Sequence, residues 1–536
     1  MELTEHMNDA LSTLLASLPM DGPGLAVGVA LGGRTVYRRG VGLANLEQAM
    51  PVTPATRMRI GSVTKQMTCL AALLMADDGQ LDLDAGVRHY LPEFAPPPDE
   101  SGEPTLRQLM WHVGGQRCYL DAGILSDGLA VKPPGAALCA QVRQREANAA
   151  IGESLIYSNG GYHLLSLAME RAAGSSIATI LEARLFAPLG MRATILVPSD
   201  LAPASDMATH YTCSAAQGYL RGIFPTEELL GEGGVVSSVD DMLLWIGELR
   251  LQRLGSAQVW RQMCACPELS NGFRSQYAGG LFIEPYRGLR TMNHAGNVVG
   301  GASHLLFLPD AELGIVVLTN GAPVDPIALA ERIVDIMLDL GSTPARNMAN
   351  TTDYAGYLGT YACYESGMVC ALCDEEGQLG LSVYQSPAET LECTADGLEL
   401  SFSRNSAGHF RIAATPTAAS VREFVLDDCG RPHRMVRLEL RPTGADRLDG
   451  RYDCADLDAT AYVADSRVMR IEGRFGHNRL VIEPLSDGIY TLRSEDPGLP
   501  RGGVLRVRHE HGIVQALQID MARTRHVVFE RRAEAA

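Results

Sequence analysis

The chain has 536 residues and a formal net charge of −18, with 46% hydrophobic and 20% charged residues. This length predicts two or three domains with packed cores, and an acidic balance without clustered basic residues argues against a nucleic-acid or anionic-membrane surface. The N-terminal segment lacks a signal-peptide pattern and no stretch reaches roughly 18 apolar residues, so we expect a cytoplasmic protein.

The first 340 residues show strand patterns at both ends and helical patterns between them. Residues 24–42 alternate around a pair of glycines, which indicates a β-hairpin. Residues 64–79 are apolar on most sides and predict a core helix. Late strands over 291–321 and an amphipathic helix over 326–341 follow. This order predicts an antiparallel sheet assembled from both ends of a domain and covered by helices.

The second part of the chain is predicted to be all-β and internally repeated. Short alternating segments are separated by Gly, Asp or Asn, and the segments from Tyr357 and from Leu448 each open with Gly, one residue and Tyr. We therefore predict three domains, at 1–343, 349–441 and 446–536, with the last two forming antiparallel barrels or sandwiches.

Ser62 and Lys65 form the strongest chemical signal in the chain. Three residues apart at the entrance of a helix, they lie on one face and can touch. A lysine activates a serine only when it is neutral, and lowering its pKa by three units costs about 4 kcal/mol, which burial can supply. Arginine cannot lose its proton this way. The chain has 45 basic residues but only two lysines, and Lys132 lies in a segment that we expect to be an exposed loop.

Two later segments offer partners for this pair. Tyr157 and Asn159 precede a helical pattern, and the tyrosine either relays a proton or is a packed ring with its hydroxyl in solvent. His294 begins a strand whose Gly296 permits close approach of the backbone to a ligand. A histidine near a strand end is either catalytic or structural, and its position alone does not decide.

The ordered motifs Ser62-x-x-Lys65, Tyr157-x-Asn159 and His294-x-Gly296 resemble the signature of the serine β-lactamase and penicillin-binding protein superfamily. Histidine in the third motif and an all-β tail make the chain similar to the bacterial D-aminopeptidases. The resemblance implies an α+β β-lactamase-like catalytic domain, with an antiparallel sheet flanked by helices, followed by two antiparallel β-barrel domains. It also implies a homodimer.

The resemblance implies a role for each catalytic residue. Ser62 attacks the carbonyl of an N-terminal D-residue and forms an acyl-enzyme. Lys65 and Tyr157 share the base and proton-relay duties, and His294 positions Tyr157 and the leaving group. Water then releases the acyl group, and no metal or organic cofactor is expected.

The resemblance also implies a set of substrate-binding residues. Asn159, Gly296 and Asn297 are expected to contact the substrate, with the backbone N–H of Asn297 completing the oxyanion site. A loop of the last barrel is expected to bring Asp496 to the substrate's ammonium group. Phe282 stands where the family pattern has a polar asparagine, which predicts a different substrate preference.

The predicted substrate is a small peptide or amino-acid amide with a free N-terminus. One alternative is an esterase or D-Ala carboxypeptidase of the same fold. Another is a non-catalytic peptide-binding or β-lactam-binding protein, against which the full set of motifs argues. The cysteine pairs Cys264/Cys266 and Cys370/Cys373 lack the four ligands of a zinc site.

Overall fold

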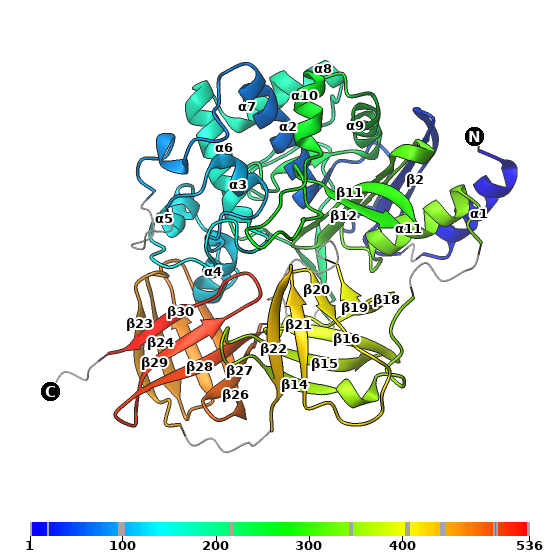
Figure 1. The fold of residues 1–536 in the computed structure, drawn as a ribbon. Helices are drawn as coiled ribbons and strands as arrows, with labels where there is room; N and C mark the ends of the chain where they lie inside the picture. The colour runs from blue at the N-terminus through cyan, green and yellow to red at the C-terminus, as the bar shows by residue number, and fades with distance from the viewer. Residues whose placement is uncertain are drawn as a thin grey trace.

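We describe the fold from a computed structural model that places residues 3–18, 21–94, 102–214, 218–341, 347–401, 408–439, 446–496, 499 and 502–532. The predicted domain boundaries at 343 and 441 lie outside these residues. Figure 1 shows a region of helices and sheet, residues 3–341, above two β-structures that lie side by side. Within the described ranges no single helix is long and apolar enough to cross a membrane; the helical pair Asn159–Ala173 and Ile177–Leu189 passes only together, with a 79° bend between them.

A six-stranded antiparallel sheet organises the first region. Its order is β10-β11-β12-β13-β1-β2. The strands are β1 (Leu25–Leu31), β2 (Arg34–Val41), β10 (Phe282–Tyr286), β11 (Leu289–Val298), β12 (Gly301–Leu308) and β13 (Leu313–Thr319). The first hairpin joins the last strands through β1 and β13, whose register pairs Leu25 with Thr319 and Leu31 with Leu313. The prediction of a sheet built from both ends of the region is therefore confirmed.

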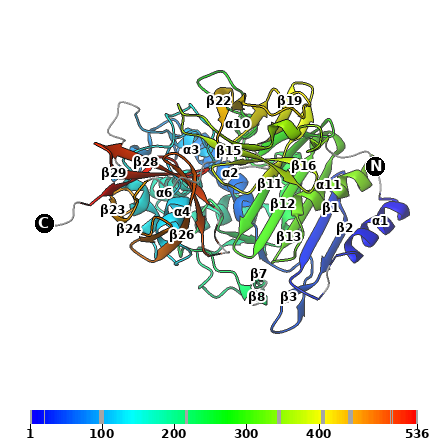
Figure 2. The same ribbon diagram turned by 90° about the horizontal axis from the view of Figure 1, so that it is seen from below.

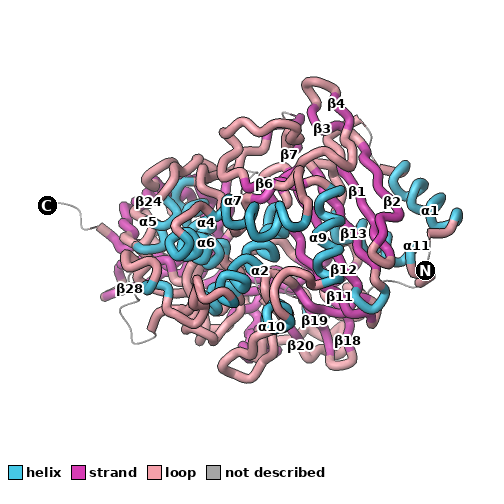
Figure 3. The backbone as a smooth tube through the Cα atoms, turned by 90° about the horizontal axis from the view of Figure 1, so that it is seen from above, coloured by secondary structure: helices cyan, strands magenta, loops and turns pink. Residues whose placement is uncertain are grey.

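Helices cover both faces of this sheet. On one face lie α2 (Thr64–Asp77) and α9 (Val239–Leu251), and on the other lie α1 (Glu5–Ala16) and α11 (Pro326–Met337), as Figure 3 shows. Every residue of β1 is buried because the strand has a packed layer on each side. Gly28 lets α9 approach closely, since a Cβ there would lie 2.4 Å from Val239 Cγ1. The predicted apolar core helix is α2, most of which is buried.

The remaining helices and strands of the first region surround the sheet. The helices are α3 (Leu106–Met110), α4 (Tyr119–Asp127), α5 (Ala136–Val142), α6 (Asn159–Ala173), α7 (Ile177–Leu181), α8 (Ala187–Leu189) and α10 (Ala257–Met263). The strands are β3 (Leu43–Asn45), β4 (Met50–Pro51), β5 (Met58–Arg59), β6 (Ile195–Leu196), β7 (Tyr211–Ser214), β8 (Gly218–Arg221) and β9 (Val235–Ser237).

The first barrel is a nine-stranded antiparallel sheet that nearly closes on itself. Its order is β17-β16-β15-β14-β22-β21-β20-β19-β18. The strands are β14 (Gly359–Ala362), β15 (Val369–Glu375), β16 (Gln378–Val383), β17 (Glu389–Thr390), β18 (Glu392–Thr394), β19 (Gly397–Leu400), β20 (Phe410–Ile412), β21 (Glu423–Asp428) and β22 (Arg431–Arg437). The end strands β17 and β18 are separated by one residue, Leu391, so one continuous segment joins the two edges.

The second barrel is closed and contains strands β23 to β30 in sequence order. They are β23 (Gly450–Cys454), β24 (Ala459–Ala464), β25 (Val468–Glu472), β26 (His477–Ser486), β27 (Ile489–Ser494), β28 (Gly503–Glu510), β29 (Ile513–Asp520) and β30 (Val527–Arg531). Figure 2 shows this barrel against α4 of the first region. The contact includes Asn478 of β26, which donates to the carbonyl of Ile124 at 3.2 Å.

The predicted repeat appears as the same tyrosine and arginine contacts in each barrel. Tyr361 donates its hydroxyl proton to the carbonyl of Tyr357 at 2.8 Å, and Tyr452 does the same to Leu448 at 2.8 Å. An arginine of the last strand lies over each ring, Arg437 at 5.0 Å and Arg531 at 5.2 Å from the ring centroid. The shared Gly-x-Tyr pattern therefore marks the start of two equivalent barrels.

Candidate active site

Ser62 lies in a single helical turn, Gly61–Val63, that leads directly into α2. This turn passes close to β11, because a Cβ on Gly61 would lie 2.9 Å from the backbone nitrogen of Asn297. Gly61 also has a φ of 50°, which favours glycine. The local sequence thus brings the hydroxyl of Ser62 and the backbone of Asn297 to one place.

The Lys65 side chain is held by three oxygen atoms. Its Nζ lies 2.9 Å from Ser62 Oγ, 2.7 Å from Asn159 Oδ1 and 2.6 Å from the carbonyl oxygen of Glu232. The amide and backbone carbonyl oxygens only accept, so Lys65 donates to both. A neutral amine has two N–H groups and one lone pair. An ammonium would donate to all three oxygens, whereas a neutral Lys65 donates to two of them and can accept the proton of the Ser62 hydroxyl.

Burial favours this neutral form of Lys65. The residue is fully buried, and burial lowers the pKa of its amine from 10.5 to about 7, against the opposing charge of Glu232. Half of the amine is then neutral near pH 7. The contact predicted between positions 62 and 65 is present, and its electrostatic setting fits a general base.

The other lysine has a different environment from the one expected. Lys132 is only 8% exposed, so the expectation of an exposed loop was wrong. It donates to the carbonyl of Gly128 at 3.2 Å. Lys132 is not among the described residues that line the pocket at Ser62.

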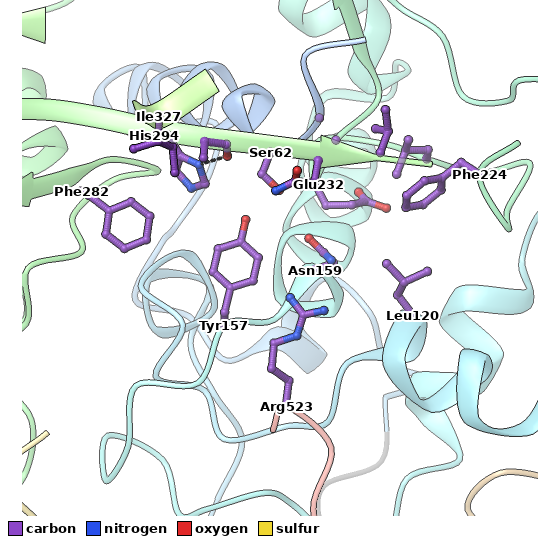
Figure 4. Close-up of a pocket in the computed structure, with 16 residues that line it drawn as sticks. Ser62, Leu120, Tyr157, Asn159, Phe224, Glu232, Phe282, His294, Ile327 and Arg523 are labelled. Carbon is purple, nitrogen blue, oxygen red and sulfur yellow. Dashed lines mark hydrogen bonds between the residues drawn. The ribbon is translucent and has the colours of Figure 1, made fainter. Parts of the chain in front are cut away.

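Tyr157 stands over the Lys65 amine, with its ring centroid 4.8 Å from Nζ. Figure 4 shows its hydroxyl directed toward Ser62 and His294. Burial raises the pKa of the phenol, and its hydrogen bond with Ser62 only partly offsets that rise. The phenol therefore keeps its proton at neutral pH and suits a relay better than a base. Its packed, buried ring excludes the alternative of a hydroxyl in bulk solvent.

His294 is a neutral imidazole at the edge of the pocket. Burial and the charge of Lys65 lower its pKa to about 3. Its Nδ1 lies 2.6 Å from the carbonyl oxygen of Ala295, which places the ring proton on Nδ1 and leaves Nε2 as an acceptor. The ring centroids of His294 and Tyr157 are 6.1 Å apart. His294 is thus near Tyr157.

Gly296 allows strand β11 to pack closely against the backbone of Ile60. A Cβ at this position would lie 2.0 Å from the carbonyl oxygen of Ile60, just before the Ser62 turn. The close approach expected toward a ligand is therefore an approach to the backbone of Ile60, and Gly296 does not line the pocket. A side chain here would push β11 away from Ser62.

These groups surround a cavity of about 260 Å³. Lining residues that carry or border the reacting groups are Gly61, Ser62, Tyr157, Asn159, Gly233, His294, Ala295, Asn297 and Val298, and the apolar ones are Leu120, Phe224, Leu229, Phe282 and Ile327. Phe282 packs its ring 5.1 Å from that of His294, so this side of the cavity is apolar where the family pattern predicts an amide.

The assignment of Asp496 to the substrate's ammonium group, which the resemblance implies, stays a prediction. Asp496 is exposed, lies just after β27, and is absent from the lining of the pocket. Residues 497, 498, 500 and 501 of its loop lie outside the described residues. The second barrel does reach the pocket, but it does so through Arg523 of the β29–β30 loop.

Two charged residues that the sequence analysis missed, Glu232 and Arg523, line the pocket. Glu232 accepts a hydrogen bond from Tyr119 at 2.8 Å and lies 3.2 Å from Nδ1 of His163. Burial alone would raise the pKa of Glu232, but His163 outweighs it and holds that pKa below its usual value. Arg523 donates to Asp121 at 2.6 Å. Neither residue belongs to a local motif, because tertiary packing alone brings them to Ser62.

Comparison with known proteins agrees with this geometry. The family model described as Beta-lactamase matches residues 15–337. The chain belongs to the beta-lactamase family. The match spans the six-stranded sheet, Ser62, Lys65, Tyr157 and His294.

Relatives of this beta-lactamase family member extend beyond the matched region. A D-aminopeptidase from Gluconobacter oxydans is 28% identical over 551 aligned positions, which cover 98% of each chain. The octameric penicillin-binding protein homologue from Pyrococcus abyssi has a TM-score of 0.57 at 20% identity, covering 88% of this chain and 98% of that one. The D-amino acid amidase from Ochrobactrum anthropi SV3, complexed with D-phenylalanine, has a TM-score of 0.53 at 19% identity and covers 62% and 99%. The expected fold and the resemblance to D-aminopeptidases are confirmed.

Proposed function

We propose that the protein is a serine hydrolase that releases N-terminal D-amino acids from small peptides, amides or esters. The observation that carries the proposal is the contact of Lys65 Nζ with Ser62 Oγ at 2.9 Å. Burial lowers the pKa of this amine and so favours its neutral form. The D-aminopeptidase and D-amino acid amidase relatives support the D-aminoacyl class of substrate.

Acylation follows from the positions of the side chains. Lys65 takes the proton of the Ser62 hydroxyl as Oγ bonds to the substrate carbonyl carbon. The oxyanion accepts hydrogen bonds from the backbone N–H groups of Ser62 and Asn297, beside the start of α2. Tyr157 relays the proton to the leaving nitrogen, and the C–N bond breaks. His294 is neutral and borders the leaving group as an acceptor.

Deacylation reverses the proton path. Water attacks the carbonyl carbon of the ester at Ser62 as Lys65 accepts its proton, Lys65 returns that proton to Ser62 Oγ as the C–O bond to the serine breaks, and the free D-amino acid leaves. Asn159 accepts a hydrogen bond from Lys65 through Oδ1 and also lines the pocket, and we assign its amide N–H groups to the substrate. These steps need no group other than the residues already named.

For the substrate's free ammonium we propose Glu232 in place of Asp496. Glu232 is the carboxylate among the described residues that line the pocket, and its buried Oε2 has no hydrogen-bond partner in the described part of the chain. Tyr119 and His163 fix the other oxygen, so the carboxylate is already oriented. The expected cytoplasmic location and homodimer stay predictions.

The test compares hydrolysis of D-Ala-p-nitroanilide, its L-isomer and p-nitrophenyl acetate by the wild-type protein and Ser62→Ala. We expect D-selective amide hydrolysis that Ser62→Ala abolishes, together with an acylated Ser62 peptide in mass spectra of quenched wild-type reactions. Ester hydrolysis alone would favour the esterase alternative. Amide turnover that survives Ser62→Ala would contradict the proposal.

A further inference from the structure

The β29–β30 loop carries a guanidinium group of the second barrel to the pocket at Ser62. Figure 4 shows Arg523 rising from this loop, with its guanidinium beside Asn159. We propose that Arg523 binds a carboxylate group of the substrate, so that the substrates are D-aminoacyl compounds carrying a second, anionic group. The inference rests on the proposed hydrolase function and adds the chemical class of its substrates.

The loop is fixed against the first region before any ligand arrives. Asn148 donates to the carbonyl of Arg523 at 2.8 Å and accepts from the N–H of Arg525 at 2.8 Å. The buried Arg117 donates to the carbonyls of Arg525 and His526, each at 2.7 Å. Because the loop is held at Arg523, Arg525 and His526, Arg523 needs no rearrangement to present its side chain, which reduces the entropic cost of binding.

The guanidinium group is held along one edge only. Its Nε and Nη2 both donate to Oδ1 of Asp121, at 3.2 and 2.6 Å. Its Cζ lies 5.8 Å from the ring centroid of Tyr157, so the group has a second neighbour besides Asp121. Nη1 makes no hydrogen bond to any described residue. An oriented guanidinium with an unused donor edge is suited to a planar carboxylate.

Among the described residues at the pocket, no other cation can take this role. The Lys65 amine is occupied by Ser62, Asn159 and the Glu232 carbonyl. His294 is neutral at the pH values where Lys65 is a base. Arg523 is therefore the cation, among the described lining residues, with a free donor.

Two parts of a substrate can supply the carboxylate. One is the C-terminal carboxylate of the residue after the scissile bond, as in a dipeptide. The other is an acidic side chain on the N-terminal D-residue. Two substrate pairs separate these sources: D-Ala-Gly with D-Ala-Gly amide, and D-Asp-p-nitroanilide with D-Asn-p-nitroanilide.

The experiment measures kcat/KM for both pairs in the wild-type protein, Arg523→Gln and Arg523→Lys. Arg493→Gln, an exposed arginine on β27 of the same barrel, is the matched control. We expect Arg523→Gln to lose about 10- to 100-fold more kcat/KM on the charged member of one pair than on its neutral member, with no such difference in the Arg493→Gln control. Arg523→Lys should keep part of the preference for the charged member, because it keeps the positive charge. Equal loss on both members of both pairs, or no loss, overturns the proposal.

A binding measurement separates this inference from the hydrolase proposal. Calorimetric titration of Ser62→Ala with D-Ala-Gly and with D-Asp amide needs no turnover, and adding Arg523→Gln should weaken one of them at least tenfold. Unchanged affinity for both overturns the inference even if hydrolysis is normal. If Arg523→Gln does not fold, competition against the wild-type protein decides: a carboxylate that binds more tightly than its amide supports the inference, and equal binding overturns it.

Discussion

The Lys65 amine donates to the side-chain oxygen of Asn159 across 2.7 Å. This contact joins the first turn of α2 to the first residue of α6, and it gives the amine a neutral acceptor where a carboxylate would hold it protonated. The side chain at position 159 therefore sets the proton affinity of the base as well as its position.

Asn159→Asp is expected to shift the pH dependence of the reaction. A carboxylate of the same shape beside Lys65 favours the ammonium form, which raises the lysine pKa by about 1–3 units. The rise of kcat/KM with pH should then move to more alkaline pH by a similar amount. A pH–rate profile of D-Ala-p-nitroanilide hydrolysis measures this shift. Asn271→Asp, at an exposed asparagine outside the pocket, should leave the profile in place.

Lys65→Arg is expected to remove activity while the protein remains folded. A guanidinium group cannot accept the serine proton, and the loss of a general base typically costs about 10²–10⁴-fold in rate. Steady-state kinetics measure the loss, and circular dichroism with thermal melting reports the fold. Turnover close to wild type in this variant would remove Lys65 from the mechanism.

Glu232→Gln is expected to raise KM for substrates with a free amine. The amide keeps the shape of the side chain but loses the charge that faces the pocket. N-acetylated substrates should change less, and Asp496→Ala should change neither class because Asp496 is exposed and outside the pocket lining. If Asp496→Ala instead raises KM for free-amine substrates alone, the assignment implied by the family resemblance is correct and Glu232 is not the ammonium partner.

Tyr361→Phe and Tyr452→Phe are expected to destabilise the barrels by similar amounts. Each change removes the hydroxyl that satisfies a backbone carbonyl, at Tyr357 and Leu448 respectively. Leaving a buried acceptor without its donor costs about 1–3 kcal/mol. Chemical denaturation measures the change in the free energy of unfolding. A loss at one barrel and none at the other would contradict the equivalence of the two tyrosines.

Much of this architecture could be predicted because it depends on local pattern. Alternation in residues 24–42 and the apolar helix after Ser62 are periodic signals, and both elements form as predicted. The Gly-x-Tyr repeat marked two barrels because the tyrosine bonds a carbonyl only four residues earlier. Such contacts are visible in a single stretch of sequence.

The charged lining of the pocket could not be predicted in this way. Arg523 reaches Asp121 across 402 positions of the chain, and no spacing rule connects the two. Family resemblance placed the second barrel at the active site through the Asp496 loop, and it gave no sign of Arg523 in the β29–β30 loop. Lys132 was misjudged because flanking Pro and Gly residues indicate a turn and say nothing of what packs on it.

The pH dependence of kcat/KM for D-Ala-p-nitroanilide tests the central claim, that a neutral Lys65 activates Ser62. Protonated Lys65 cannot accept the serine proton, so activity should be lost at acid pH, rise with an apparent pKa of about 7, and level off above it. An acid limb that is centred well below pH 5, or that persists unchanged in Asn159→Asp, would contradict the claim.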